Sequence, residues 1–149
     1  MHSRREMFGS LAGLAAVCVS AQAVEAQKAD PMVGMGNRAM TKQECAETCH
    51  KSHVMCLQTV TYCLEQGGNH ILPSHIALLL DCAEICQTTA NSLTRDSPQH
   101  NVVCDACARI CEACERDCKT FQADSQMERC GRTCKVCAVS CHDMVKTLQ

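Results

Sequence analysis

The apolar positions of the chain recur every three or four residues in four separate segments, which is the period of amphipathic helices. Turn residues separate these segments: Gly67 and Gly68 follow the first, and Pro98 opens the third. Val, Ile and Thr form no alternating runs, so the pattern does not favour strands. It predicts helices over residues 41–65, 73–93, 97–121 and 125–147. Because the connections are short, we expect an all-α fold, an antiparallel up-down four-helix bundle.

The buried stripe of each predicted helix is made of cysteine where leucine is usual. Residues 104–118 read CDACARICEACERDC, in which five cysteines are separated by steps of three, four, three and four. This is the spacing of the a and d positions of a helix bundle, so these side chains should line the bundle interior. Charged residues such as Arg109 and Glu112 take the opposite face. The four stripes together contain fifteen candidate ligands: Cys45, Cys49, Cys56, Cys63, Cys82, Cys86, Cys104, Cys107, Cys111, Cys114, Cys118, Cys130, Cys134, Cys137 and Cys141.

Histidines and methionines continue these stripes by one heptad at both ends of the predicted bundle. They are therefore candidate metal ligands beside the thiols, with side-chain packing as the alternative role. Antiparallel packing predicts two end groups: His100 and Met144 with Cys45, Cys104 and Cys141, and His75 and Met127 with Cys63, Cys118 and Cys130.

Two further candidate ligands lie at less regular positions. His53 is one turn from both Cys49 and Cys56, where it either supplies an imidazole ligand or faces the flank of the bundle, and we favour the flank. Met40 ends a lead-in over residues 27–40, whose glycines, proline and lack of helical period predict a flexible, methionine-containing segment.

Residues 1–26 have the features of an export signal. Arg4 and Arg5 precede a short stretch of small and apolar residues, and AxA-like cleavage sites end at Ala23 or Ala26. The apolar stretch is shorter than a membrane-spanning helix, and the paired arginines are typical of the twin-arginine route. We therefore expect a periplasmic protein with no membrane anchor after cleavage; an N-terminal amphipathic or membrane anchor is the alternative.

Cysteine usage and charge narrow the possible functions. The chain has 16 cysteines among 149 residues, a formal net charge of −2 and only 2% aromatic residues. A chain without basic runs and aromatic platforms is a poor nucleic-acid binder, so we expect no nucleic-acid partner. Signal cleavage would remove Cys18 and leave fifteen cysteines, which cannot all pair within one chain. Reduced thiols in an exported protein need protection, and a bound metal would supply it.

Disulfides and zinc are the alternatives to consider. Cysteines four apart on a helix have Cβ atoms about 5 to 6 Å apart, beyond the roughly 3.5 to 4.5 Å of a disulfide. Disulfides between helices remain possible, so a disulfide-stapled exported helical protein stays open. A zinc or mixed-metal thiolate buffer also stays open, although four thiolates around Zn²⁺ leave two uncompensated negative charges in a dry core. The chain lacks the cysteine loop of iron–sulfur proteins.

Copper(I) suits the pattern better because it has a single charge and prefers soft thiolate ligands. An array of bridging thiolates becomes neutral at one ion per cysteine, which predicts about fifteen Cu(I) ions per chain. Six CxxxC pairs place two thiols one helical turn apart, so we expect two-coordinate sites within each helix. Sites saturated with thiolate leave no open position for a substrate, so we expect no enzyme. The methionine-containing lead-in begins at the end of the bundle where we expect His100 and Met144. We therefore expect copper to enter at that end.

The segments CDACARICEACERDC and CGRTCKVCAVSC, together with the twin-arginine-like start, resemble the exported copper storage proteins. The resemblance covers the whole predicted mature chain. It implies a homotetramer of four-helix bundles, each filled with Cu(I) along its axis. It also implies storage of copper for copper-dependent enzymes, with copper-delivery or copper-requiring proteins as partners.

Overall fold

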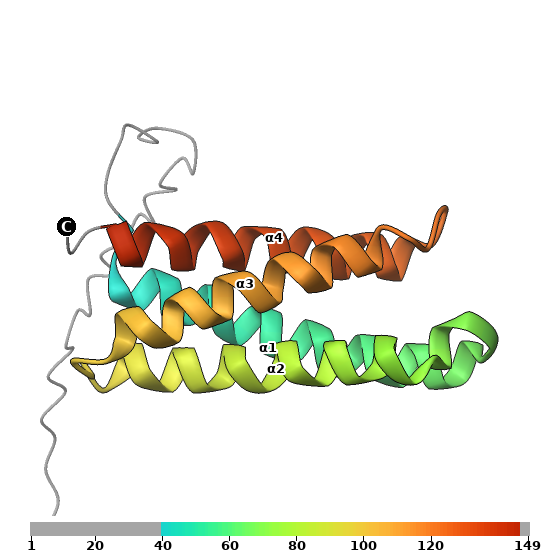
Figure 1. Ribbon diagram of the computed structural model, residues 1–149, viewed down its shortest axis with the longest axis horizontal. Coiled ribbons are helices and arrows are strands. Elements are labelled where there is room, and N and C mark those ends of the chain that lie inside the picture. Colours follow the sequence, from blue (N-terminus) through green and yellow to red (C-terminus); the bar gives the residue numbers. More distant parts are fainter. Residues whose placement is uncertain (1–39, 147–149) are drawn as a thin grey trace, which may run out of the picture. The chain divides into compact units, whose positions relative to one another are not determined.

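The computed structural model describes residues 40–146, which form four long helices and one short 3-10 helix (Figure 1). The predicted signal peptide and all of the lead-in except Met40 lie outside the described residues. Within residues 40–146 there is no strand, and the predicted all-α bundle is confirmed. No helix in this part of the chain is long and apolar enough to cross a membrane. The elements are α1 Lys42–Gln66, η1 Gly68–Ile71, α2 Pro73–Thr94, α3 His100–Cys118 and α4 Ser125–Lys146.

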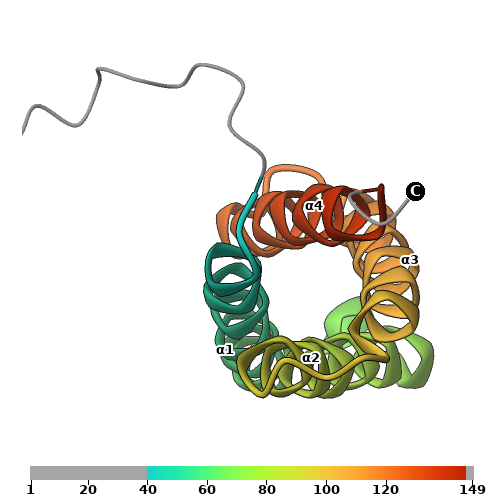
Figure 2. The ribbon, with the colours of Figure 1, turned by 90° about the vertical axis from the view of Figure 1, so that its left-hand side faces the viewer.

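The four long helices form a square when the bundle is viewed along its axis (Figure 2). Helix α1 packs against α2 and α4, and α3 packs against the same two helices. Among the described residues, the diagonal pairs α1–α3 and α2–α4 make no close backbone contact. Each helix therefore turns one face toward a shared axis, which is where its stripe of buried residues lies.

The ends of α1 and the start of α2 follow from local sequence. Thr41 and Glu44 form a capping box: Thr41 Oγ1 accepts the Glu44 N–H at 3.2 Å, and Glu44 Oε2 accepts the Thr41 N–H at 2.9 Å. Helix α1 stops at Gly67, whose φ of 70° lies in the left-handed region that glycine tolerates. Pro73 opens α2 at the first helical position. The N–H that proline lacks would have no partner within the helix there, so no hydrogen bond is lost.

Helix α3 is shorter than predicted at both ends. Ser97 and Pro98 belong to the preceding turn, because the His100 N–H donates to the Ser97 carbonyl three residues earlier, at 3.1 Å. At the other end, the Phe121 N–H donates to the Cys118 carbonyl at 3.2 Å, again three residues earlier. These tighter bonds replace the i→i−4 pattern and confine the α-helix to His100–Cys118.

Candidate metal centre

Fifteen free thiols occupy the bundle axis, and each is at most 1% exposed. All four helices supply them, because the heptad spacing returns every cysteine to the inward face. Four groups have all their Sγ atoms within 4.8 Å of one another: Cys49, Cys107, Cys137 and Cys141; Cys86, Cys107, Cys111 and Cys137; Cys56, Cys114, Cys130 and Cys134; and Cys45, Cys104 and Cys141.

These groups form one continuous stack of thiols. Cys107 and Cys137 belong to two groups, and so does Cys141. Cys82 joins the group around Cys134 to the rest, since its Sγ lies 3.8 Å from Cys134 and 3.7 Å from Cys111. Ions bound along this axis would therefore share thiolates with their neighbours.

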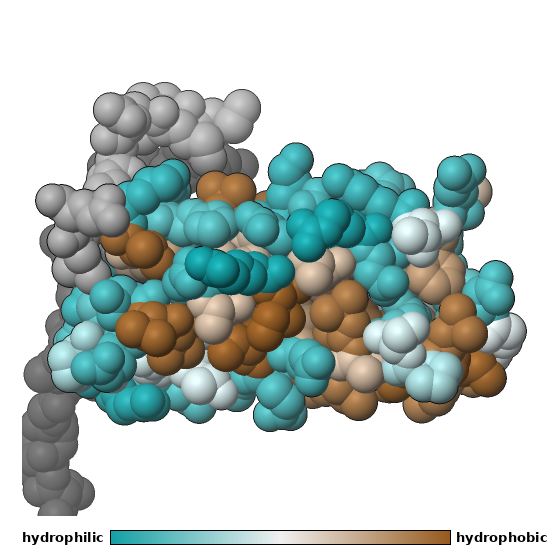
Figure 3. Space-filling model, in the orientation of Figure 1, coloured by the Kyte–Doolittle hydropathy of each residue, from teal (hydrophilic) through white to brown (hydrophobic). Residues whose placement is uncertain are grey.

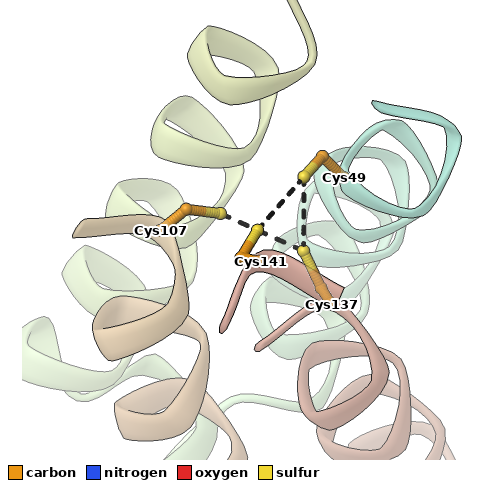
Figure 4. Close-up of side chains that lie close together, drawn as sticks. All are labelled: Cys49, Cys107, Cys137 and Cys141. Carbon is orange, nitrogen blue, oxygen red and sulfur yellow. Dashed lines mark hydrogen bonds between the residues drawn. The ribbon is translucent and has the colours of Figure 1, made fainter. Parts of the chain in front are cut away.

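Figure 4 shows one group, in which Cys49, Cys107, Cys137 and Cys141 point toward one another from α1, α3 and α4. The Sγ of Cys49 lies 3.6 Å from that of Cys141 and 3.7 Å from that of Cys137. A disulfide would bring two sulfurs to about 2.05 Å. Two thiolates bound to one metal ion at about 2.3 Å lie roughly 3.8 to 4.6 Å apart. Small side-chain rotations would therefore convert these pairs into metal ligands.

Most close thiol pairs join different helices. Among the described residues, Cys107 and Cys111, at 3.9 Å, are the one CxxxC pair whose thiols form a hydrogen bond with each other. Cys86, by contrast, lies 3.5 Å from Cys111 across the α2–α3 interface. Side chains one turn apart run alongside each other, whereas side chains from facing helices converge on the axis. The structure therefore favours sites shared between helices over the predicted two-coordinate sites within one helix.

The thiols of the stack share protons in the metal-free protein. The pKa of Cys107 lies far below its ordinary value because its thiolate accepts hydrogen bonds, first from Cys111 and then from Cys137. The pKa of Cys86 lies far above its ordinary value because this thiol interacts first with Cys107 and then with Cys111. Neighbouring thiols therefore cannot all ionise together, and metal binding must displace protons.

At one end of the bundle, here called the Cys104 end, thiols from three helices meet. His100 is buried there, and its Nδ1 donates to the Ser97 carbonyl at 2.7 Å. Met144 of α4 is buried as well. The structure thus brings Cys104, which has no CxxxC partner, against cysteines of two other helices, as the group of Cys45, Cys104 and Cys141.

At the opposite end, here called the His75 end, Cys63 contacts a nitrogen and a thioether. Its Sγ lies 3.4 Å from His75 Nε2 and 3.9 Å from Met127 Sδ. Burial, together with the nearby Cys130, raises the pKa of the Cys63 thiol to about 11. Cys130 was predicted to join this end group; it lies near Cys63 and also belongs to the thiol group that contains Cys114. Three different donor atoms therefore meet around Cys63.

Leu79 and Thr59 interrupt the thiol stripes on two helices near the His75 end. Leu79 lies on α2 between His75 and Cys82, and Thr59 lies on α1 just before Cys63. Both side chains are fully buried in the core. They place hydrocarbon and a hydroxyl where thiols would continue the stack, which separates Cys63 from the thiols of α1 and α2.

Two carboxylates at the His75 end were not predicted, and Asp117 is one of them. Asp117 of α3 accepts a short hydrogen bond from His75 Nδ1 through its Oδ2. The Phe121 ring packs against the same imidazole, with ring centroids 4.6 Å apart. No sequence pattern pointed to Asp117, because its partner is 42 residues away.

Asp124 is the second carboxylate, and it caps α4. Its Oδ1 accepts the N–H groups of Gln126 and Met127 at 2.9 and 3.0 Å. Its Oδ2 accepts hydrogen bonds from Tyr62 Oη and His70 Nε2, both at 2.9 Å. Burial raises the pKa of Asp124, but these hydrogen bonds outweigh it and hold the pKa below its ordinary value. An Asp just before a predicted helix is a capping signal that could have identified this residue.

His53 and Met40 lie away from the thiol groups. His53 Nδ1 donates to the Ala83 carbonyl at 2.9 Å, in the seam between α1 and α2. This is the flank position that the sequence favoured. The hydrogen bond holds the imidazole in the seam between the two helices, away from the thiol groups. Met40 is partly buried and packs against the core before α1 begins.

Comparisons with known proteins agree with this geometry. A family model described as copper storage protein matches residues 37–146. The chain belongs to the copper storage protein family. No curated protein matches it.

Three similar solved structures each cover more than two thirds of this copper storage protein. A protein from Nitrosospira multiformis is 37% identical, with a TM-score of 0.67, over 71% of this chain and 95% of that one. The Cu(I)-bound copper storage protein BsCsp3 is 34% identical, with a TM-score of 0.64, over 68% and 94%. Apo-Csp3 from Bacillus subtilis is 34% identical, with a TM-score of 0.62, over 68% and 95%.

One surface cavity of this copper storage protein reaches the metal-ligand candidates. It has a volume of about 400 Å³, and its lining includes Cys118 and Met127 at the His75 end. Gly131 also lines it, and a Cβ there would lie 3.3 Å from the Cβ of Cys118. The larger cavity, about 640 Å³ between α1 and α2, is lined by no cysteine. This cavity lies at the His75 end, whereas the sequence favoured copper uptake at the end of His100.

Proposed function

We propose that this protein stores Cu(I) in its bundle core, at about one ion per cysteine and so about fifteen ions per chain. Fifteen buried, free thiols, nearly all of them in one continuous stack, carry the proposal. A store needs many sites of one kind that exclude water, and the stack provides them. The similarity to Cu(I)-bound BsCsp3 supports copper as the ion.

Charge distinguishes copper from zinc in this core. The buried residues of the described chain include no Lys or Arg, so no protein cation is available to neutralise thiolates. Four-thiol groups could hold Zn²⁺ geometrically, but each would keep a net charge of −2 in a dry interior. Bridging thiolates with Cu(I) reach neutrality without help from the protein. Copper is therefore the cargo that the stack can hold in the largest number.

An anaerobic titration of the purified mature protein with Cu(I), against a strong chelator, tests the proposal. We expect saturation near fifteen equivalents, with release of about one proton for each copper bound. Saturation at three or four equivalents would contradict storage. Thiol counting before and after copper removal addresses the disulfide alternative, which requires few free thiols in both samples. Competition with a zinc salt addresses the zinc alternative, which requires zinc to displace most of the copper.

We also propose that the protein is exported and that it supplies copper to other proteins. The arginine pair and AxA-like sites of residues 1–26 support twin-arginine export to the periplasm. Storage there would serve copper-requiring proteins and would need no catalytic step. Mass spectrometry of the protein from periplasmic extracts tests this location: an N-terminus after Ala23 or Ala26 supports it, and an intact N-terminus in the cytoplasm contradicts it.

A homotetramer is proposed from surface apolar side chains. Figure 3 shows apolar side chains gathered along α2 and α3 on one face of the bundle. Helix α2 exposes Leu80, and α3 exposes Val102. Exposed apolar groups of this kind are covered when subunits associate. Light scattering of the mature protein should give four times the chain mass, and a monomer mass would contradict the assembly.

A further inference from the structure

The imidazole of His75 is held on three sides at the end of the bundle. It is 2% exposed and lies in the first turn of α2. Its Nε2 faces Cys63 Sγ at 3.4 Å, and its Nδ1 donates to Asp117 Oδ2 of α3. The Phe121 ring covers the imidazole at a centroid distance of 4.6 Å. The ring therefore has one nitrogen directed at a sulfur and the other at a carboxylate.

Only one nitrogen of a neutral imidazole can bind a metal ion, because the other carries the proton. A carboxylate is a pure acceptor, so Asp117 places the proton on Nδ1 and leaves the lone pair on Nε2. We propose that Asp117 is a positioning residue for copper: it selects the tautomer of His75 that directs Nε2 toward Cys63. This inference rests on the proposed storage of Cu(I).

The Cys104 end offers an independent parallel. His100 also donates through Nδ1, here to the Ser97 carbonyl at 2.7 Å, and a carbonyl is likewise a pure acceptor. Both buried histidines therefore keep Nε2 free of a proton. At the Cys104 end a backbone group fixes the tautomer and cannot be removed by mutation. At the His75 end a side chain does so, and Asp117 is 31% exposed, which makes it open to substitution.

The tautomer can be measured without copper. In long-range ¹H–¹⁵N spectra of the neutral imidazoles, we expect wild-type His75 to be protonated at Nδ1. Asp117→Asn introduces an amide that can either accept or donate, and Asp117→Ala removes the acceptor. Both should produce a substantial Nε2–H population. Asp105→Asn is the control, because Asp105 lies on the same helix and pairs with Arg109. An unchanged His75 tautomer in both Asp117 variants would overturn the proposal.

Copper release gives the second readout. Loss of an outer-sphere partner weakens a metal site by about 10- to 100-fold, so chelator competition should show this change for roughly one copper equivalent. Total capacity should fall by no more than about one ion. In a His75→Phe background, Asp117→Asn should have no further effect, because the imidazole through which it acts is gone.

The possible outcomes separate the two proposals. If the wild-type protein fails to load many Cu(I) ions, storage is wrong and the copper role of Asp117 falls with it. If the wild type loads normally and the Asp117 variants hold copper as tightly in the chelator competition, only the positioning role is wrong. An Asp117 effect that persists unchanged in the His75→Phe background points to a purely structural tie between α2 and α3 and also overturns the proposal.

Discussion

The two ends of the bundle hold their outermost candidate ligands in different ways. At the Cys104 end, thiols of three helices lie within 4.8 Å of one another and continue directly into the stack. At the His75 end, a single thiol contacts an imidazole and a thioether, and Leu79 separates it from Cys82 on the next turn of α2. The outermost thiols therefore lie against one another at the Cys104 end, whereas Cys63 lies against an imidazole and a thioether at the His75 end.

The charges around the two ends differ as well. At the His75 end, the carboxylates of Asp117 and Asp124 accept hydrogen bonds from His75 and His70. At the other end, a backbone carbonyl accepts the hydrogen bond of His100. Carboxylates favour the approach of cations, and the cavity at Cys118 and Met127 lies on the same side. Most candidate ligands therefore lie in the thiol stack, while the carboxylates and the cavity lie together at the His75 end.

Copper loading should have the largest effect. Each site filled at a thousand times its dissociation constant adds about 4 kcal/mol, and many such sites exceed the whole stability of an ordinary domain. We expect the melting temperature to rise on the order of tens of degrees on loading. Hydrogen exchange should slow more around Cys104 than around His75, because more ligands are fixed there. Calorimetry and exchange mass spectrometry check this; equal protection of both ends would contradict the comparison.

Removing thiols should reduce capacity unequally at the two ends. Serine at Cys45, Cys104 and Cys141 together should remove about three Cu(I) equivalents, since each thiolate neutralises about one ion. Cys63→Ser combined with Met127→Leu should remove about one. Titration against a chelator measures both, with circular dichroism as the control for folding. Equal losses in the two variants would contradict the expected proportion of about one ion per thiolate.

Leu79 tests the separation between the stack and Cys63. In the metal-free protein, Leu79→Ala should lower the free energy of unfolding by about 2 to 5 kcal/mol, because it leaves a cavity in the core. Leu79→Cys should instead extend the stack and raise capacity by about one Cu(I) ion. Urea denaturation and copper titration are the measurements. If Leu79→Cys binds no additional copper, Leu79 is not what interrupts the stack.

The helices and the inward direction of the cysteines could be predicted, because both follow from a local period. Helices α1, α2 and α4 begin and end within one residue of the predicted bounds. Helix α3 was predicted too long because the turns at Ser97 and Phe121 depend on i→i−3 hydrogen bonds that the sequence does not reveal.

Pairing between helices could not be predicted from the same pattern. Whether Cys86 meets Cys111 depends on the relative axial shift of α2 and α3, which loop geometry and packing determine together. The contact between His75 and Asp117 spans 42 residues and has no local signal. The sequence thus identified the candidate ligands, and the three-dimensional packing determined which of them lie close enough to share an ion.

Asp124 gives the smallest effect and tests the carboxylates of the His75 end. Asp124→Ala removes the cap of α4, so the metal-free protein should lose about 1 kcal/mol of stability at neutral pH. The folded-state pKa of Asp124 lies below its ordinary value of 3.8, so its contribution is complete above that pH. It is lost as the pH falls through the lower, folded-state value. Urea denaturation of both proteins should therefore give stabilities that converge in acid. An Asp124 difference independent of pH would show that the charge of this carboxylate does not stabilise the His75 end.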